Sequence, residues 1–253
     1  MFMEVMKYIM ERRKKAPIHL TLIDPDKQKP ENAAELAKQA KEAGSDAIMV
    51  GGTFGDAYGE RLNGTISKIK QESGLPVILF PNSAQQLSPE ADALFFMSLL
   101  NSRSTQYLID EQMKGALIVR KYGIEPLSMA YLIIESGSTT SAGWAGDVRP
   151  IPRGKPEFAV GYALAAKYFG MKFIYLEAGS GAKHPVPNDM VITVKKSIGD
   201  NMMLIVGGGI RDPETAKEKV AAGADAIVTG TIAEDDQEKF KSIIMAVKGS
   251  RKD

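Results

Sequence analysis

The chain has 253 residues, of which 44% are hydrophobic and 25% charged, and its 32 Lys and Arg residues against 31 Asp and Glu residues give a net charge of +1. This hydrophobic content excludes disorder, and the missing basic excess argues against a protein that binds nucleic acid. The absence of Cys excludes disulfides and thiolate metal sites, and the two His residues, His19 and His184, argue against a multi-histidine metal site.

The first fifteen residues predict a short amphipathic helix with Met6, Ile9 and Met10 on one face. Its basic residues come at the end, the reverse of a signal peptide. The longest uncharged run, residues 73–89, is interrupted by prolines and carries many polar residues, so it does not predict a membrane-spanning helix. We therefore expect a cytoplasmic protein without a membrane span.

Short apolar runs recur along the rest of the chain, each followed by Gly, Asp, Pro or Ser. They predict eight strands, at about 18–23, 46–50, 76–80, 93–97, 129–134, 172–176, 203–206 and 225–229. These runs are too apolar for strands with one exposed face, and they are typical of a parallel sheet that is buried on both sides.

Helical patterns fill most of the gaps between these runs. Segment 31–43 ends at Gly44, and segment 213–222 follows Asp212, which suits an N-cap. Segment 103–121 has apolar residues at helical spacing, namely Ile109, Met113, Ala116 and Leu117. Segment 81–92 has prolines and no such stripe, so we predict that the helix after the third strand is missing or reduced to a turn.

Eight βα units in one chain predict an α/β fold, a (β/α)8 TIM-like barrel that forms a single domain over residues 1–253, with an N-terminal helix and its active site at the carboxyl ends of the strands. A doubly wound open sheet is the alternative. That fold usually has a glycine-rich fingerprint after its first strand, where this chain has residues 24–27, DPDK.

Two segments of the chain resemble each other. AGSDAIMVGG (43–52) and AGADAIVTGT (222–231) match at six of ten positions. The second and eighth strands are thus either copies of one βα unit or a chance similarity between helix–turn–strand junctions.

Glycine clusters follow the last three predicted strands: residues 178–182 (AGSGA), 207–209 (GGG) and 230–231 (GT). Exposed backbone N–H groups before a helix bind phosphate, and the loops after strands seven and eight form the usual phosphate site of such barrels. Tight turns alone are the other explanation of these glycines.

The carboxylates after the first and sixth predicted strands are candidates for the chemistry of the site. Asp24 and Asp26 flank a proline, a pattern that fits either a turn or a Mg²⁺ site, to which the Thr53 hydroxyl could add a ligand. Glu177 comes directly after an apolar run and before glycines. It is a candidate general base, with an ion pair at the rim as the alternative.

Five motifs together resemble the geranylgeranylglyceryl phosphate synthases, archaeal enzymes that make the first ether bond of membrane lipids. They are LTLIDPDK, GGT, YLEAGSGA, VGGGIRDP and TGT, after strands one, two, six, seven and eight. The resemblance covers nearly the whole chain and is most specific at Tyr-x-Glu-x-Gly-Ser-Gly. The fold of that family is a modified (β/α)8 barrel without its third helix, in agreement with segment 81–92.

The resemblance implies a Mg²⁺-dependent prenyltransferase that joins geranylgeranyl diphosphate to sn-glycerol 1-phosphate and releases diphosphate. Asp24 and Thr53 would hold Mg²⁺, and Glu177 would deprotonate the glycerol hydroxyl that attacks the prenyl C1. The glycerol phosphate would be bound by Tyr175, Leu176, Glu177, Ala178, Gly179, Ser180, Gly181, Gly207, Gly208, Gly230 and Thr231.

Several points stay open. Residues 95–97 either line a trough for the prenyl tail or belong to the barrel core. Bacterial heptaprenyl relatives have a lysine where this chain has Leu22, which leaves open which group supplies that positive charge. Relatives form dimers or hexamers, so we expect a homo-oligomer.

Two other functions fit a phosphate-binding barrel. A phosphosugar isomerase or cyclase of histidine or tryptophan synthesis would use paired acids after strands one and five, here Asp24 and Glu135. A catalytically silent phosphate-binding scaffold is the second alternative.

Overall fold

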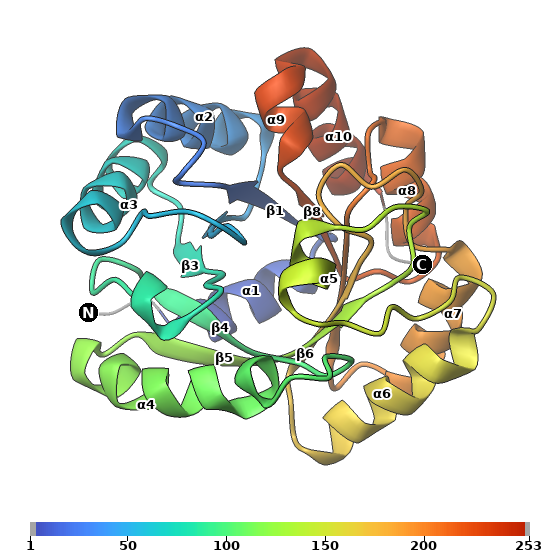
Figure 1. Cartoon of the computed structure of the whole chain (residues 1–253). Coiled ribbons are helices and arrows are strands. Elements are labelled where there is room, and N and C mark those ends of the chain that lie inside the picture. Colours follow the sequence, from blue (N-terminus) through green and yellow to red (C-terminus); the bar gives the residue numbers. More distant parts are fainter. Residues whose placement is uncertain (1–3, 251–253) are drawn as a thin grey trace.

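In the computed structural model, which describes residues 4–250, a closed ring of parallel strands is surrounded by helices (Figure 1). The described residues form eight strands: β1 (Ile18–Ile23), β2 (Ala47–Val50), β3 (Val77–Leu79), β4 (Ala93–Leu99), β5 (Glu125–Ile133), β6 (Phe173–Glu177), β7 (Met203–Gly207) and β8 (Ala226–Thr229). Neighbouring strands follow the order of the chain, and β1 pairs with β8 to close the ring. The predicted (β/α)8 barrel is confirmed, although β5 begins earlier than the predicted residue 129.

The helices precede, separate and follow the strands in the chain. They are α1 (Val5–Arg13), α2 (Pro30–Ala43), α3 (Gly59–Ser73), η1 (Ala84–Gln86), η2 (Gln106–Asp110), α4 (Glu111–Tyr122), α5 (Ser141–Ala145), α6 (Pro156–Tyr168), α7 (Asn188–Ile198), α8 (Pro213–Ala221), α9 (Thr231–Asp235) and α10 (Gln237–Gly249). Between β3 and β4 the structure has the three-residue turn η1 in place of a full helix. The predicted loss of the third helix is therefore confirmed.

Side chains alternate along each strand between the barrel interior and the surrounding helices. On β6, Phe173 and Tyr175 belong to the interior cluster, whereas Ile174 and Leu176 pack in the outer cluster under the helices. Because both faces are buried, the strands are apolar throughout, as the sequence predicts.

Helix α1 closes the amino-terminal end of the barrel. Its residues Val5 and Ile9 are buried in the interior cluster. Glu125, at the start of β5, accepts hydrogen bonds from the backbone N–H groups of Val5 (2.5 Å) and Met6 (3.1 Å), which satisfies donors that a helix N-terminus leaves free. The predicted face of Met6, Ile9 and Met10 packs against the same cluster.

The two similar segments flank β1 on either side, because β1 pairs with both β2 and β8. Their aspartates hold neighbouring arginines of α1. Buried Asp225 accepts from Arg13 Nε at 2.9 Å, and Asp46 lies 3.6 Å from Arg12 Nη1. Each segment thus contacts the N-terminal helix through its aspartate.

The apolar stripe of the predicted helix 103–121 does not face the barrel. Its members Ile109, Met113 and Leu117 are 58%, 64% and 74% exposed. Helical spacing places these residues on one face, but it does not tell which face the barrel covers.

Among the described residues, none of the helices is both apolar enough and long enough to cross a bilayer.

Candidate active site

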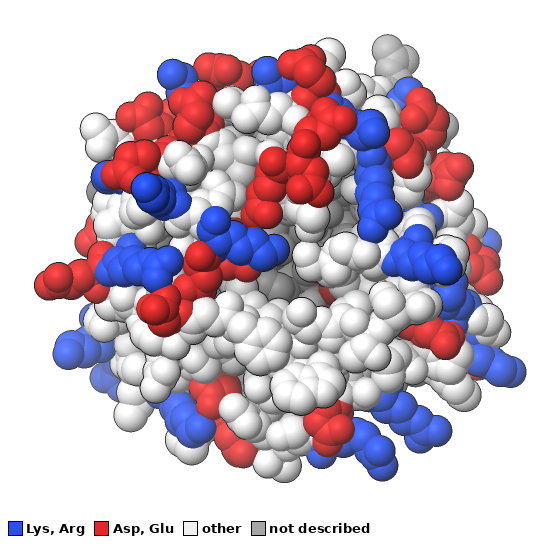
Figure 2. Space-filling model, turned by 45° about the horizontal axis from the view of Figure 1, so that its top comes forward, with Lys and Arg blue, Asp and Glu red and all other residues white. Residues whose placement is uncertain are grey.

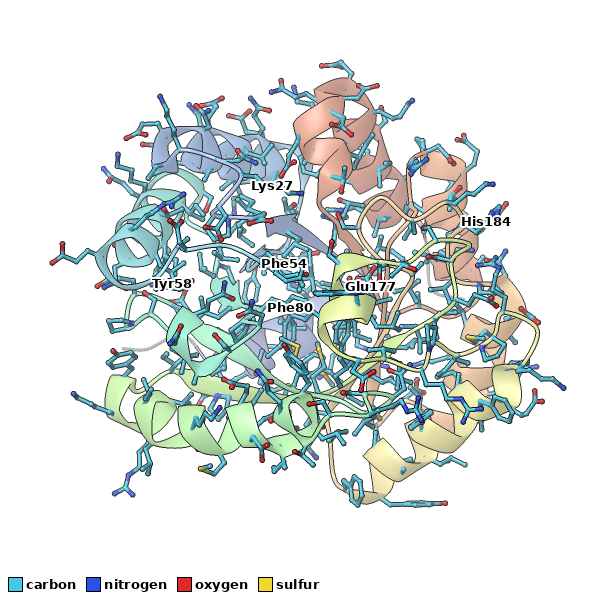
Figure 3. The ribbon with its side chains drawn as sticks, viewed as in Figure 1. Lys27, Phe54, Tyr58, Phe80, Glu177 and His184 are labelled. Atoms are coloured by element: carbon cyan, nitrogen blue, oxygen red, sulfur yellow. The ribbon has the colours of Figure 1, made fainter. Side chains whose placement is uncertain are left out.

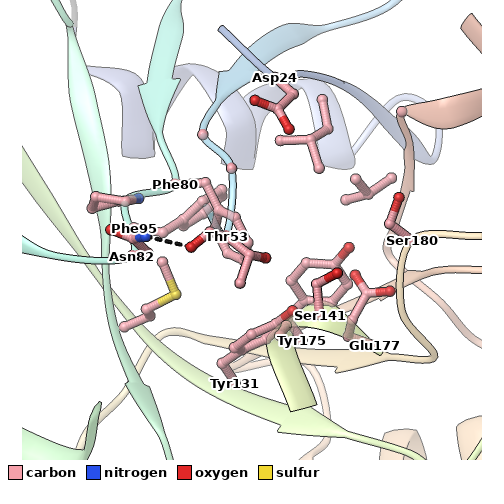
Figure 4. A pocket seen from close by; sticks show the side chains of 18 of the residues that line it. Asp24, Thr53, Phe80, Asn82, Phe95, Tyr131, Ser141, Tyr175, Glu177 and Ser180 are labelled. Atoms are coloured by element: carbon pink, nitrogen blue, oxygen red, sulfur yellow. Dashed lines mark hydrogen bonds between the residues drawn. The ribbon is translucent and has the colours of Figure 1, made fainter. Parts of the chain in front are cut away.

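A cavity of about 480 Å³ opens at the carboxyl end of the barrel. The inward alternation of the strands explains which residues reach it. In steps of two, Leu20 and Leu22 lead to Asp24, just past the end of β1. Phe173 and Tyr175 lead in the same way to Glu177, the last residue of β6. Both carboxylates line the cavity. Figure 4 shows them on opposite sides of it, with Thr53 near Asn82 and Phe80.

Glu177 is 7% exposed and ends β6. Its Oε1 accepts a hydrogen bond from the backbone N–H of Gly179 at 2.5 Å. Burial raises the pKa of the Glu177 carboxyl, while hydrogen bonds from the Tyr175 hydroxyl and Gly179 act in the opposite direction. A carboxylate whose pKa is raised toward neutrality is suited to accept a proton.

Three positions around this carboxylate have no space for a Cβ atom and therefore require glycine. Gly208 has φ +79°, and a Cβ there would lie 2.5 Å from Gly179 N and closer still to Glu177 Oε1. A Cβ on Gly207 would overlap the Tyr175 hydroxyl, and one on Gly179 would overlap Thr140. The GGG motif therefore lets the β7 loop pass directly over the β6 carboxylate.

The predicted phosphate loops meet beside Glu177. The Ser180 and Thr231 hydroxyls lie 2.9 Å apart and join the loops after β6 and β8. Arg211 donates to the carbonyl oxygens of Gly181 (3.0 Å) and Ala182 (3.1 Å), which joins the loop after β7 to that after β6. The three loops thus form one surface of glycine N–H groups and hydroxyls.

Some predicted binding residues lie elsewhere. The side chains of Leu176 and Ala178 pack in the outer core, and Ala178 N–H donates to Gly207 O at 3.0 Å. The N-terminus of α8 is also occupied, since Asp212 Oδ1 accepts from Thr215 N at 2.7 Å. Among the predicted phosphate-binding residues, Gly179, Ser180, Gly181, Gly208, Gly230 and Thr231 do line the cavity.

Asp24 lies at the opposite rim. Its Oδ1 accepts from the Asp26 N–H at 3.1 Å, and a Cβ on Gly52 would lie 2.6 Å from that oxygen. Burial raises the pKa of the Asp24 carboxyl. Asp26 accepts from the N–H groups of Asp56 and Ala57, both at 2.8 Å, and so orders the loop after β2.

These residues fit a Mg²⁺ ion that keeps part of its water shell. The described residues contain no group of three or more acidic or His residues that could enclose a metal ion. One Asp24 carboxylate and the nearby Thr53 leave room at the cavity wall, and such open sites suit Mg²⁺ bound by few carboxylates together with substrate phosphates. The Thr53 carbonyl is engaged by Asn82 Nδ2 at 2.5 Å (Figure 4).

An apolar trough continues from the cavity where the third helix is missing. Leu94 and Phe96 belong to the outer face of β4, which helices cover elsewhere, yet both line this cavity, as do Leu87 after η1 and Val119 of α4. Phe95 and Met97 line it from inside the barrel. The reduced connection thus opens the trough, and residues 95–97 take part both in the core and in the trough.

Three aromatic side chains lie where the trough meets the polar end. The Phe80 ring centroid lies 5.2 Å from that of Tyr131 and 5.8 Å from that of Tyr175. Burial and the charge of Glu177 raise the pKa of the Tyr131 hydroxyl well above its ordinary value, so the group stays protonated. Sequence reasoning missed Phe80 and Tyr131, although inward alternation from Ile78 and from Met129 points to them.

The outer mouth has a further aromatic pair. Phe54, in the loop after β2, and Trp144, in α5, are 57% and 73% exposed, with ring centroids 6.2 Å apart. Figure 2 shows an uncharged band beside the opening, with acidic and basic side chains intermixed around the rest of the rim.

Comparison with known proteins decides the family. The sequence matches the PcrB family over residues 7–248. This chain belongs to the PcrB family. It is 55% identical over 232 residues to the geranylgeranylglyceryl phosphate synthase of Methanothrix thermoacetophila, covering 90% of this chain and 89% of that protein. The synthase of Thermococcus kodakarensis is 52% identical over 252 residues, covering 97% and 98%.

A solved structure agrees with the sequence relatives. The (S)-3-O-geranylgeranylglyceryl phosphate synthase of Thermoplasma acidophilum, in complex with its substrate sn-glycerol-1-phosphate, matches with a TM-score of 0.91 and 42% identity, covering 97% of this chain and 99% of that chain. This PcrB-family protein is therefore an enzyme, a prenyltransferase of the geranylgeranylglyceryl phosphate synthase type.

Asp24 and Glu135, the two acids that an isomerase or cyclase would use, do not form a pair in this PcrB-family enzyme. Glu135 is exposed and does not line the cavity that contains Asp24. Its carboxylate accepts instead from Arg153 N at 3.4 Å. The tryptophan synthase alpha chain of Legionella pneumophila matches with a TM-score of 0.56 at 17% identity, which shows a common fold alone.

Proposed function

We propose that this enzyme transfers a prenyl group from geranylgeranyl diphosphate to a hydroxyl of sn-glycerol 1-phosphate and releases diphosphate. The observation that carries the proposal is the place of the Glu177 carboxylate, between the phosphate loops and the apolar trough. A polar acceptor and an apolar donor substrate meet at such a junction. The complex of the Thermoplasma acidophilum relative with sn-glycerol-1-phosphate supports the acceptor.

The glycerol phosphate is held by the glycine loops. Ser180 and Thr231 offer hydroxyls, and Gly181, Gly208 and Gly230 offer backbone N–H groups, to an anion beside Glu177. Such donors bind phosphate without a net positive charge. This explains how a chain with a net charge of +1 binds an anionic substrate.

Glu177 accepts the proton of the attacking hydroxyl. The glycerol oxygen forms a bond to the prenyl C1 while the bond from C1 to the diphosphate oxygen breaks. Holding both substrates in the cavity supplies proximity, and Phe80, Tyr131 and Tyr175 exclude water from the reacting carbon.

Asp24 and Thr53 are the residues that would hold Mg²⁺. When bound, the ion screens the negative charge of the diphosphate. Asp24 serves this role because its carboxylate is held at the rim by the Asp26 N–H, away from Glu177.

We also propose that the enzyme is a homo-oligomer. The outward stripe of Ile109, Met113 and Leu117 lies on η2 and α4, and the exposed Phe158 and Phe169 lie on and just after α6, the next helix of the outer ring (Figure 1). Exposed apolar side chains that lie near one another on a surface are typical of protein interfaces. Light scattering after size-exclusion chromatography tests this: a homo-oligomer that Leu117→Glu dissociates supports it, and a monomeric wild-type chain contradicts it.

The experiment compares two glutamates at the same end of the barrel. Glu177→Ala is expected to lower Mg²⁺-dependent prenyl transfer at least about 100-fold, the lower range for loss of a general base. Glu135→Ala, at an exposed glutamate outside the cavity, keeps near wild-type transfer. Normal turnover of Glu177→Ala contradicts the proposed base, and isomerase activity that survives EDTA without prenyl transfer supports the isomerase alternative.

A further inference from the structure

The charged side chains that line the cavity are mostly acidic, whereas both proposed substrates are anionic. The described residues that line it include two cationic side chains, Lys27 and Arg211. The acidic ones outnumber them: Asp24, Glu111, Glu177, Glu234 and Asp235. Prenyl transfer brings two anionic groups, a phosphate and a diphosphate, into this cavity. Each therefore needs local donors or cations to overcome repulsion.

The two cations are engaged differently. The Arg211 guanidinium is bound to the carbonyl oxygens of Gly181 and Ala182, in the loops that we assign to glycerol phosphate. Within residues 4–250, the Lys27 ammonium has no hydrogen bond or ion pair. The charge of Lys27 acts on the nearby Asp24 carboxyl, but its ammonium donates no hydrogen bond there and is therefore available to an anionic ligand at the same rim.

The position of Lys27 matches the second anion. Its backbone N–H donates to Asp24 O at 3.3 Å, which closes the turn after β1. Figure 3 shows Lys27 beside the end of β1, while Glu177 lies on the β6 side of the opening. The phosphate loops occupy the side of β6 to β8, so the remaining anion lies at the rim that carries Asp24 and Lys27.

We propose that Lys27 binds the diphosphate of the prenyl substrate. This rests on the proposed prenyl transfer and gives a role in it to the lysine that ends the motif after the first strand. Leu22, two positions before Asp24, lines the same cavity and is apolar. A long, flexible lysine side chain five residues later supplies the charge from the rim.

The role extends to the reaction. As the bond between C1 and the diphosphate oxygen breaks, its electron pair goes to the diphosphate, and the glycerol oxygen forms the new bond while its proton goes to Glu177. Negative charge on the diphosphate thus increases in the transition state. An ammonium that donates hydrogen bonds to it lowers the barrier as well as binding the substrate.

Binding of inorganic pyrophosphate tests this role without turnover. The wild-type chain, saturated with sn-glycerol 1-phosphate and Mg²⁺, is titrated with pyrophosphate by calorimetry. Lys27→Ala is expected to weaken pyrophosphate binding at least about tenfold, as for loss of a hydrogen bond to a charged group, and to change glycerol phosphate binding less than about twofold. Lys27→Arg retains most of the affinity. Lys29→Ala, at an exposed lysine of the same loop that does not line the cavity, is the matched control.

Steady-state kinetics give a second readout. Lys27→Ala is expected to raise KM for the prenyl diphosphate and lower kcat, with KM for glycerol phosphate unchanged. Equal pyrophosphate affinity in Lys27→Ala and Lys29→Ala overturns the role of Lys27, and so does a loss confined to glycerol phosphate. A wild-type chain that transfers no prenyl group contradicts the proposed function instead, so the two failures are distinguishable.

Discussion

Replacing Gly208 by Ala tests how the glycine motif serves Glu177. The new Cβ would lie 2.5 Å from Gly179 N, whereas Cβ contacts under 3.0 Å essentially never occur, so the β6 loop has to move by at least 3.0 − 2.5 = 0.5 Å. The positive φ adds about 1–2 kcal/mol of backbone strain, and the overlap adds about 1–3 kcal/mol. We expect the free energy of unfolding to fall by roughly 2–5 kcal/mol.

The same movement displaces the Glu177 carboxylate, which the new Cβ meets first. Misplacement on the order of 1 Å lowers rates about 100-fold, so kcat for prenyl transfer is expected to fall by roughly that factor. Gly123→Ala is the control: Gly123 ends α4 with φ +71° and has no atom within 4 Å of the added Cβ, so it loses about 1 kcal/mol of stability and no activity. Urea unfolding and a transfer assay at a temperature where all variants are folded measure both effects. Near-wild-type kcat in Gly208→Ala refutes this account of the motif.

Three further predictions concern Glu177 and the N-terminal helix. The Tyr175 hydroxyl lowers the pKa of Glu177, so Tyr175→Phe moves the acid limb of the kcat–pH profile to higher pH, and an unmoved limb contradicts this coupling. Burial raises the pKa of Glu177 above the unfolded value of about 4.3, so the fold loses stability as the pH rises and this carboxyl ionises. Glu177→Gln is therefore expected to raise the free energy of unfolding at pH 8 more than at pH 4. An equal gain at both pH values refutes the assignment. Arg13→Ala breaks a buried ion pair with Asp225 and is expected to lower the free energy of unfolding by about 3 kcal/mol. Arg12→Ala, at a half-exposed arginine, is expected to lower it by less than about 1 kcal/mol. Equal losses in the two variants would contradict this difference in burial.

The strand order and the missing third helix follow from local patterns. Strands that are apolar on both faces indicate a buried parallel sheet, and the prolines around residues 81–92 exclude a helix there. Asp24 and Glu177 could be predicted from local sequence because each follows an apolar run, and the active site of a barrel lies at the carboxyl ends of its strands. A local stretch of sequence can predict these features because each depends on the backbone geometry and burial of one short segment.

Other features depend on contacts between distant segments. The start of β5 at Glu125 depends on pairing with β4 and on the bonds from α1 to its carboxylate, although Pro126 disfavours a strand. Phe80 follows β3, Tyr131 lies in β5 and Tyr175 lies in β6, and the closed barrel brings the three side chains together. The outward stripe of α4 shows the same limit, because spacing defines a face but not what covers it.

The most direct measurement of the central claim is incubation of the wild-type chain with radiolabelled sn-glycerol 1-phosphate, Mg²⁺ and prenyl diphosphates of increasing chain length. We predict that label passes into a lipid-extractable prenylglyceryl phosphate, that geranylgeranyl diphosphate is the preferred donor, and that EDTA abolishes the transfer. Label that stays in the aqueous phase with every donor would contradict the account.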